Sequence, residues 1–272
     1  MKLVFDVGSN NGDDISYYLH KADIVVAVEA NPYLCRIISK KFQSEIEEKR
    51  LFIENKAISD SNQKVTNFYI SKKNHVMSTI FPPRENLDDW DQIKVGTISC
   101  NRLIEKYGKP DYIKVDIEGA DNLFLLQLHE SKHKPKYISA ESHQLDIFVT
   151  LSEKLGYKSF KLVEGRRVGA TYRKKKIFSR YLNKNIIYNF PFHSAGPFGN
   201  DINGNWYDRD SFLLVLATKK LGWIDIHATT EFEGKQIGFS KMVSIMGIAI
   251  AKRVLAIAKK SDLRKHLFRF KE

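Results

Sequence analysis

The sequence predicts an α/β protein with a doubly wound, mostly parallel sheet of seven strands and helices on both faces. Short apolar runs alternate along the chain with amphipathic stretches of about ten residues, the pattern of repeated strand–helix–strand units. A glycine-containing turn follows the first apolar run, and acidic residues follow several of the others. Because the carboxyl ends of parallel strands form the ligand-binding edge of such sheets, these residues are the candidates for a functional site.

The first strand, residues 3–5, leads through Asp6 into the turn Gly8-Ser9-Asn10-Asn11-Gly12 and then into a helix. Glycine here allows backbone angles or close ligand contacts that a side chain would block. The turn has neither the G-x-G-x-x-G of dinucleotide binders nor the Lys and Ser/Thr of a phosphate loop. It therefore suits a ligand without phosphates, of which S-adenosylmethionine is the commonest in doubly wound folds. The alternative is an ordinary strand-to-helix turn.

The second strand, residues 24–28, ends at Glu29, and Asn31-Pro32 begins the next helix. An acid at this strand end, roughly 20 residues past the glycine turn, is placed to hold a pair of ribose hydroxyls. Its two carboxylate oxygens can accept from both hydroxyls at once. A solvated strand-end acid is the alternative. Asp60, which follows the third strand at residues 51–53, is expected beside the base of the same ligand.

The remaining elements continue this alternation. Apolar spacing predicts helices over residues 32–48, 101–107, 121–128 and 146–155, and further strands over residues 112–115, 137–141, 157–163 and 212–216. Weak alternation suggests an added strand over residues 65–70, and a loop is expected over residues 82–92. The short helix that begins near residue 101 is expected to have Asn101 as its cap and Gly108 as its stop.

Acidic side chains follow the fourth and fifth strands. Asp116 and Glu118 stand at the end of the fourth strand, and Glu141 stands with His143 at the end of the fifth. Two carboxylates one residue apart, followed by glycine, are more typical of a functional site than of a solvated surface at this edge. A His is suited to proton removal near neutral pH. Clustered acids could instead bind a divalent metal through their oxygens.

Several segments of the chain together resemble the FkbM-type methyltransferases: residues 5–12 with Glu29, residues 55–60, Ile113-Lys114-Val115-Asp116-Ile117-Glu118-Gly119, and Glu141-Ser142-His143. The likeness covers roughly residues 3–163. It implies a Rossmann-like class I methyltransferase that takes its methyl group from S-adenosylmethionine and methylates hydroxyl groups, often on sugars of glycans or on secondary metabolites. One departure is Ser99-Cys100-Asn101, where the family usually has Thr-Leu-Asp, so no carboxylate is present at that position.

The C-terminal part differs from the rest in charge. Residues 1–162 contain 23 Lys/Arg and 23 Asp/Glu, whereas residues 163–272 contain 21 and 9, which accounts for the whole net charge of +12. We predict a methyltransferase domain over residues 1–217 and a basic helical extension over residues 218–272. Within the domain, an aromatic-rich insertion at about residues 164–210 separates the sixth and seventh strands and suggests an acceptor-binding lid. An insertion that packs only on itself is the alternative.

Composition excludes several classes of protein. No run approaches the roughly 18 apolar residues that a membrane-spanning helix needs, and residues 1–6 begin a strand rather than a signal peptide. Cys35 and Cys100 are too few for a disulfide framework or a cysteine-built zinc site, so a cytoplasmic protein is expected. The basic tail is expected to pack on the sheet or on a partner, or else to lie peripherally on the anionic inner face of a membrane.

The expected function is that of an S-adenosylmethionine-dependent O-methyltransferase with a small-molecule or glycan acceptor. Cofactor contacts are expected from Asp6, Gly8, Asn10, Glu29, Asn31, Asp60 and Asp116, and catalytic roles from Glu118, Glu141 and His143. A divalent metal is a further candidate, and the oligomeric state is open. One alternative is a nucleic-acid binder or modifier that uses the basic C-terminal part, although the neutral N-terminal part and the lack of a nucleic-acid motif disfavour it. The other is a non-catalytic scaffold that retains the cofactor fold.

Overall fold

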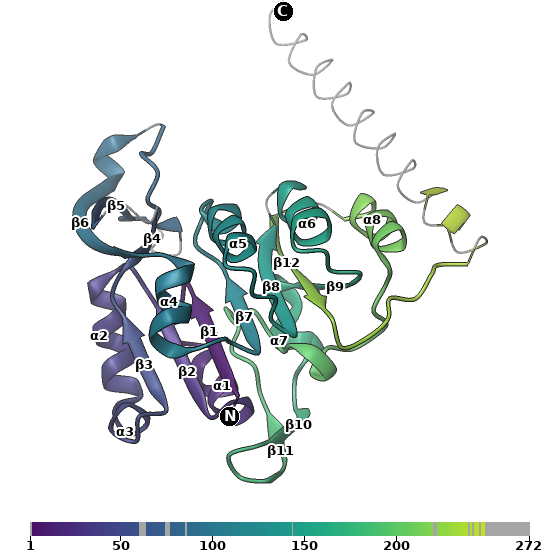
Figure 1. Ribbon diagram of the computed structural model, residues 1–272, viewed down its shortest axis with the longest axis horizontal. Coiled ribbons are helices and arrows are strands. Elements are labelled where there is room, and N and C mark those ends of the chain that lie inside the picture. Colours follow the sequence, from purple (N-terminus) through teal and green to yellow (C-terminus); the bar gives the residue numbers. More distant parts are fainter. Residues whose placement is uncertain are drawn as a thin grey trace, which may run out of the picture.

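The computed structural model describes residues 2–59, 64–73, 77–84, 86–142, 144–219, 222–238, 240, 242–244 and 246–247. Its main element is a seven-stranded sheet in the order β3-β2-β1-β7-β8-β12-β9 (Figure 1). The strands are β1 (Leu3–Val7), β2 (Ile24–Val28), β3 (Leu51–Glu54), β7 (Tyr112–Val115), β8 (Tyr137–Ser142), β9 (Ser159–Glu164) and β12 (Gly222–Thr229). β12 runs antiparallel to both of its neighbours, and the other pairs are parallel. The predicted doubly wound, mostly parallel sheet is confirmed.

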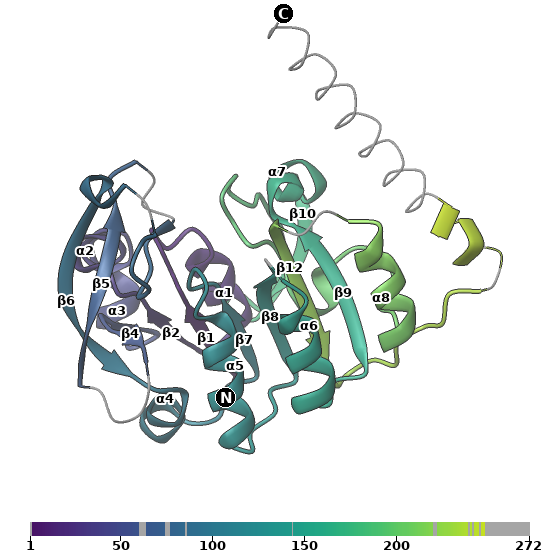
Figure 2. The same cartoon turned by 90° about the horizontal axis from the view of Figure 1, so that it is seen from above.

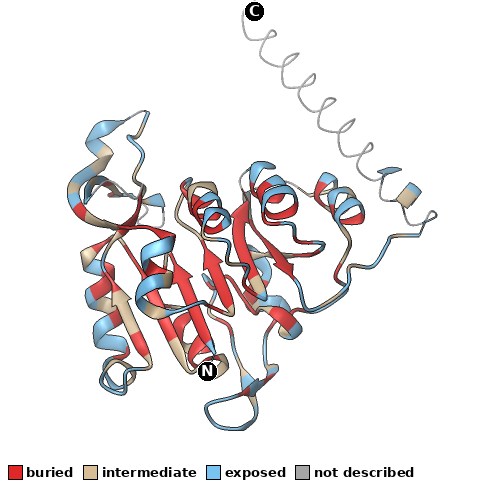
Figure 3. Ribbon diagram, viewed as in Figure 1, coloured by how far each residue is buried: buried red, intermediate tan, exposed pale blue. Residues whose placement is uncertain are grey.

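Helices cover both faces of this sheet (Figures 1 and 2). One face carries α4 (Cys100–Tyr107), α5 (Asp121–Glu130), α6 (Asp146–Val149) with a π-helical turn at Thr150–Lys154, and α8 (Arg209–Ala217). The other carries α1 (Ile15–Lys21), α2 (Pro32–Lys41) and the short α3 (Gln43–Glu47). The strands between them are almost wholly buried (Figure 3). The core therefore consists of two apolar layers, one on each side of the sheet.

The insertion after β9 packs on the same face as α1. It contains a 3-10 turn at Gly165–Arg167, α7 (Val168–Thr171), and a hairpin of β10 (Lys175–Ser179) and β11 (Lys184–Tyr188), followed by a loop and a 3-10 turn at Gly199–Asp201. Phe198 of this segment stacks on Tyr112 of β7 with ring centroids 3.9 Å apart. The Tyr17 hydroxyl of α1 donates to Asp201 over 2.8 Å. The alternative that the insertion packs only on itself is therefore wrong.

A second, three-stranded sheet follows β3 in the chain. It has the order β4-β6-β5 and consists of β4 (Ala57–Ile58), β5 (Val65–Ser71) and β6 (Trp90–Ile98), with a 3-10 turn at Leu87–Asp89 before β6. The added strand over residues 65–70 is confirmed. The loop predicted to reach residue 92 is too long, because β6 already begins at Trp90 and pairs antiparallel with β5. Most of β6 is exposed or half-buried, so its apolar pattern is weak and pairing with β5 determines its conformation.

The strand predicted over residues 212–216 is wrong, because these residues lie in α8. A short apolar run cannot be assigned to strand or helix by periodicity alone. Here Asp208 caps the helix by accepting from the Ser211 amide over 2.8 Å, and the buried Phe212 and Leu216 are four residues apart on one face. The seventh strand is β12, so the predicted domain boundary at residue 217 excluded a strand that belongs to the sheet.

Two smaller helix predictions also change. The helix predicted over residues 32–48 divides at Phe42 into α2 and α3. The cap of α4 is Ser99, whose hydroxyl accepts from the Arg102 amide over 3.3 Å, so Asn101 lies inside the helix. Gly108 ends α4 with φ +96°, as predicted. The helical extension predicted over residues 218–272 contains β12 and, within its described part, only short helical pieces between residues 240 and 247; the residues after 247 lie outside the described ranges. Among the described helices, none has the length and apolar character to span a bilayer.

The packing of α8 gives a test of the revised topology. We expect Phe212→Ala to lower the free energy of unfolding by about 3–5 kcal/mol, because the ring is fully buried against Phe148 and Phe160. The neighbouring Leu213 is 45% exposed, so Leu213→Ala should change the stability by less than about 0.5 kcal/mol. Urea denaturation of both variants provides the measurement. Comparable losses for the two substitutions would contradict the helical assignment.

Candidate functional site

A cavity of about 660 Å³ lies at the carboxyl ends of β1, β2, β7 and β8. Its lining combines the glycine turn after β1, the end of β2, the β4–β5 region, the segment after β7, and residues from the insertion and β12. The predicted site residues in this lining are Gly8, Asn10, Glu29, Asp116, Glu118 and Glu141. The cavity therefore lies at the edge of the sheet where the sequence predicted a site. His143 and Asp60 lie outside the described residues.

The glycine turn is held tightly between the ends of β2 and β7. The amides of Gly8 and Ser9 both donate to the Val28 carbonyl, over 2.9 and 3.1 Å. Gly8 has φ +86°, and a Cβ at this position would lie 1.7 Å from the Asp116 carbonyl oxygen. Only glycine fits such an approach. The turn thus brings its backbone, including Asn10, to the cavity without a side chain at its closest point.

Glu29 closes one side of the cavity. Its Oε2 accepts from the Asn10 amide and its Oε1 from the Asn31 amide, each over 2.8 Å. The side chain is largely buried, and burial raises its pKa to about 7, although the two amide donors lower it. Each oxygen retains a lone pair after these bonds. A diol presented from the cavity could therefore be held by a carboxylate that is already fixed in position.

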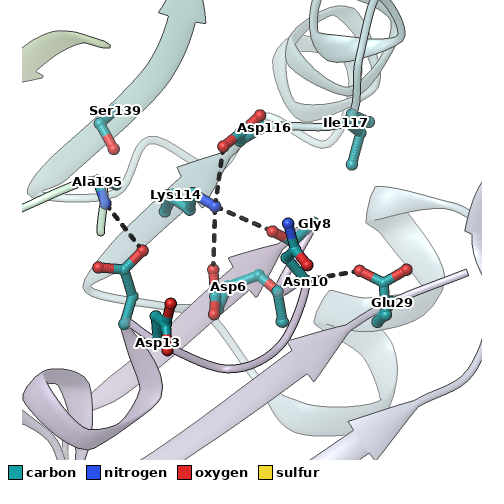
Figure 4. A network of polar contacts seen from close by, with 12 residues as sticks. Asp6, Gly8, Asn10, Asp13, Glu29, Lys114, Asp116, Ile117, Ser139 and Ala195 are labelled. Atoms are coloured by element: carbon teal, nitrogen blue, oxygen red, sulfur yellow. Dashed lines mark hydrogen bonds and ion pairs between the residues drawn. The ribbon is translucent and has the colours of Figure 1, made fainter. Parts of the chain in front are cut away.

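Lys114 on β7 joins the strand ends beneath the turn. Its Nζ donates to the Gly8 carbonyl over 2.9 Å and lies 3.2 Å from Asp116 Oδ2 and 3.8 Å from Asp6 Oδ1 (Figure 4). Burial opposes the charge of this lysine, but Asp116, Asp6 and Asp14 raise its pKa well above the usual value. Lys114 is therefore the buried cation that organises three surrounding segments: β1, the glycine turn and the end of β7.

Two predicted cofactor contacts need correction. Asp6 is fully buried under the turn and does not line the cavity, and burial raises its pKa to about 6 in spite of Lys114. Asn31 is also outside the lining, because its side chain turns back to cap α2 by accepting from the Tyr33 amide over 2.9 Å. Both residues act on the site through neighbours: Asp6 through Lys114, and Asn31 through its amide bond to Glu29.

Three predicted acids converge in the lining of the cavity. Asp116, Glu118 and Glu141 each present a carboxylate oxygen within 4.8 Å of the others. The loop that carries the first two is fixed by Asp121, which accepts from the amides of Ile117 and Gly119 over 3.0 and 3.1 Å. Glu118 has φ +47°, a left-handed conformation that is uncommon for a non-glycine residue and costs conformational energy.

The C-terminal half supplies a wall of the cavity that the sequence did not predict. Arg166, His193 and Trp223 all line it, and the rings of His193 and Trp223 stack with centroids 5.9 Å apart and planes at 17°. Gly165 permits this arrangement, because a Cβ there would lie 2.2 Å from Trp223 Nε1. Asp14 of the α1 region anchors the same loop by accepting from the Ser194 hydroxyl and, over 3.0 Å, from the Ala195 amide.

The sequence contains a signal for some of the cavity residues that were not predicted and none for others. Lys114 stands between Ile113 and Val115 in a buried strand, and a charge in that position signals a buried ion pair. His193 lies in the aromatic stretch of the insertion that was predicted to meet the acceptor. Arg166 is one of many basic residues in the C-terminal part, and Trp223 had no signal because β12 itself was not predicted.

A sheet of this order, with one antiparallel strand and a glycine turn after its first strand, defines a Rossmann-like class I methyltransferase fold. The family model described as the methyltransferase FkbM domain matches residues 6–159, more than half of the chain. The chain belongs to this family, as its motifs suggested, and the family implies use of S-adenosylmethionine. A comparison with curated proteins finds no match.

Solved structures give weaker likenesses. The methyltransferase FkbM from Methylobacillus flagellatus KT is 14% identical with a TM-score of 0.37, over 57% of this chain and 36% of that one. The C-terminal domain of precorrin-6Y C5,15-methyltransferase from Rhodobacter capsulatus is 10% identical with a TM-score of 0.38, over 84% and 79%. This chain thus spans about a third of the length of the first structure. Family membership rests on the family model and not on these similarities.

The buried lysine gives a testable consequence for stability. We expect Lys114→Met to lower the free energy of unfolding by about 3–5 kcal/mol at pH 8, because it leaves Asp6 and Asp116 without their buried counter-ion. A buried carboxyl group with a raised pKa destabilises the folded protein at every pH at which the same group is ionised in the unfolded chain. The loss should therefore shrink as pH falls toward about 6, below which Asp6 is protonated even when Lys114 is present.

Denaturant unfolding at pH 8 and pH 5 measures this effect. Lys56→Met is the matched control, since Lys56 forms its 3.2 Å ion pair with Glu54 at a partly exposed position, where such pairs contribute less than about 1 kcal/mol. An equal loss for Lys114→Met at both pH values would show that the lysine stabilises the fold by packing alone.

Proposed function

We propose that this protein is an S-adenosylmethionine-dependent O-methyltransferase that methylates a hydroxyl of a sugar, a glycan or a secondary metabolite. One observation carries the proposal: the lining of a single cavity has two sets of groups, the glycine turn with Glu29 and three convergent carboxylates. The first set suits a nucleoside without phosphates, and the second suits an acceptor that must be oriented and deprotonated. Membership of the FkbM family supports the same function.

The residues present fit the cofactor. Gly8 allows close approach to the backbone of the turn, and Glu29 is fixed where it can accept from two ribose hydroxyls. Ala57 and Ile58 of β4 add an apolar surface beside Glu29 that suits a base, next to the segment where Asp60 was predicted to act. Asp116, oriented by Lys114, is the candidate partner for the amino-acid end. When bound, S-adenosylmethionine supplies a methyl group that is already activated on its sulfonium.

The protein's own contribution is alignment and proton removal. Holding an acceptor oxygen in line with the methyl group can supply on the order of 7–11 kcal/mol of the barrier reduction. Glu118 and Glu141 lie where they can grip the acceptor or take its hydroxyl proton. His143 remains a candidate for the same role and is immediately followed by the loop into α6.

The far wall of the cavity favours a polyhydroxylated acceptor. The stacked rings of His193 and Trp223 offer an aromatic face to the apolar side of a sugar ring, while Arg166 and the carboxylates offer partners for its hydroxyls. The insertion would then act as the acceptor-binding element. Three carboxylates at the reactive end would repel a phosphate backbone, so nucleic acid is the less favoured acceptor.

The proposed partners and location follow from composition. We place the enzyme in the cytoplasm, and the basic tail is proposed to make peripheral contact with an anionic membrane, where each basic residue contributes about 1 kcal/mol. Such contact would bring the site close to a lipid-linked glycan. The residues that would make it lie mostly outside the described ranges, so this remains a prediction from the sequence.

The cofactor assignment predicts a binding defect. Glu29→Ala should weaken S-adenosylmethionine binding by about 1.5–3 kcal/mol, roughly 10- to 150-fold, because a charge-assisted pair of hydrogen bonds is lost. Glu54→Gln is a control at the end of the neighbouring strand β3, where the carboxylate faces Lys106 and Tyr107 instead of the cavity. Isothermal calorimetry measures both. Unchanged affinity in a folded Glu29→Ala protein would remove Glu29 from the cofactor site.

The catalytic assignment predicts a separation of binding from turnover. Glu118→Gln, Glu141→Gln and His143→Ala should each bind S-adenosylmethionine like the wild type, yet lose about 10²- to 10⁴-fold in methyl transfer if they act as the base. Release of S-adenosylhomocysteine is followed in single-turnover assays with a panel of glycosides and glycans as acceptors. Wild-type rates in all three variants would exclude these residues from catalysis. Cofactor binding without turnover on any acceptor would instead indicate a non-catalytic scaffold.

A further inference from the structure

We propose that Asp116, Glu118 and Glu141 form a binding site for one divalent cation, with Asp225 as a buried carboxylate behind it. The cation is of the hard, oxygen-seeking class that includes Mg²⁺, Mn²⁺ and Ca²⁺. The cation site is inferred from the arrangement of the carboxylates described below. Its role in holding an acceptor hydroxyl rests on the proposed function.

The geometry of the three acids suits such an ion. Their nearest carboxylate oxygens all lie within 4.8 Å of one another. Metal–oxygen distances of about 2.0–2.6 Å mean that two oxygens on opposite sides of one ion are roughly 4–5 Å apart, and adjacent ones are closer. Small side-chain rotations would therefore bring all three into one coordination sphere. Because Asp116 and Glu118 share one loop fixed by Asp121, the ion would not have to order the backbone.

A second observation points to a ligand at the same place. Asp225 on β12 lies directly opposite Glu141 on β8, so their side chains leave the same face of the sheet. It is only 2% exposed, and its Oδ2 has no hydrogen-bond partner among the described residues. A buried carboxylate oxygen without a partner, beside another acid of the cluster, is an arrangement that a nearby cation would stabilise.

Lys114 and Arg166 are two described cations in the lining of the same cavity. Lys114 contacts Asp116 and Asp6 and also donates to the Gly8 carbonyl, so it serves the base of the turn. Arg166 lines the cavity but is exposed to solvent. A divalent ion between Asp116, Glu118 and Glu141 would be held by three carboxylate oxygens that line the cavity. It would also face the open space where an acceptor oxygen must sit, and a bound hydroxyl there would lose its proton more readily.

Mn²⁺ is the probe for this site, because its binding to the full-length protein can be followed by electron paramagnetic resonance without any substrate. We expect one Mn²⁺ per chain, displaced by excess Mg²⁺ or Ca²⁺. Glu118→Gln and Glu141→Gln should each weaken binding by at least about tenfold, and Asp225→Asn by about tenfold through loss of the supporting carboxylate. Glu105→Gln, on the exposed face of α4, should leave binding unchanged.

Two results would overturn the proposal. One is an absence of bound Mn²⁺ at millimolar concentration in the folded wild-type protein. The other is wild-type binding in the folded double variant Glu118→Gln/Glu141→Gln, which would place the ion elsewhere. Calorimetry with S-adenosylmethionine in the presence of a chelator separates this proposal from the proposed function. Cofactor binding without any Mn²⁺ site would refute only the cation, whereas Mn²⁺ bound at these acids without cofactor binding would refute only the methyltransferase.

Discussion

The charge on Lys114 is the constraint on which the rest of the site depends. A lysine in a buried strand stays charged only if its surroundings replace the water it has lost. Here the replacement comes from the Gly8 carbonyl, Asp116 and Asp6, which belong to three different segments. The interaction that keeps the lysine ionised therefore also fixes the turn against the end of β7. It orients Asp116 toward the cavity before any ligand arrives, which is the preorganisation that binding and catalysis both require.

This constraint explains why the insertion is part of the domain. The residue pairs Asp6–Lys114, Lys114–Ser139, Ser139–His227 and His227–Lys161 form one polar row across the sheet. All five side chains are buried, and burial together with Lys161 lowers the pKa of His227 to about 3, so this ring is neutral. Such a row must be shielded from water on the side facing α1. The aromatic residues of the insertion provide this cover, and the low dielectric they create strengthens the Lys114 ion pairs.

The polar row also explains why some strands could be predicted from the sequence and β12 could not. The strands β1, β2, β7 and β8 were predictable because each is an apolar run followed at once by a polar ligand candidate. β12 was not, because its alternating Asp225 and His227 have the pattern of an exposed strand although both are buried. The apolar run at residues 212–216 was therefore predicted to be the seventh strand instead of β12. Spacing gave the positions of Asp116, Glu118 and Glu141, but their convergence depends on the strand order and on the left-handed backbone at Glu118.

The two halves of the chain contribute opposite chemistry to one cavity. The N-terminal half, which carries the family motifs, supplies the glycine turn, Glu29 and the loop with Asp116 and Glu118. The C-terminal half supplies Arg166 and the ring stack of His193 and Trp223. Since Gly165 must lack a side chain for Trp223 to fit, the aromatic wall is coupled to the first residue of the insertion. Under the proposed function, changes in the insertion and β12 would alter the acceptor side of the cavity without touching the Lys114 ion pairs.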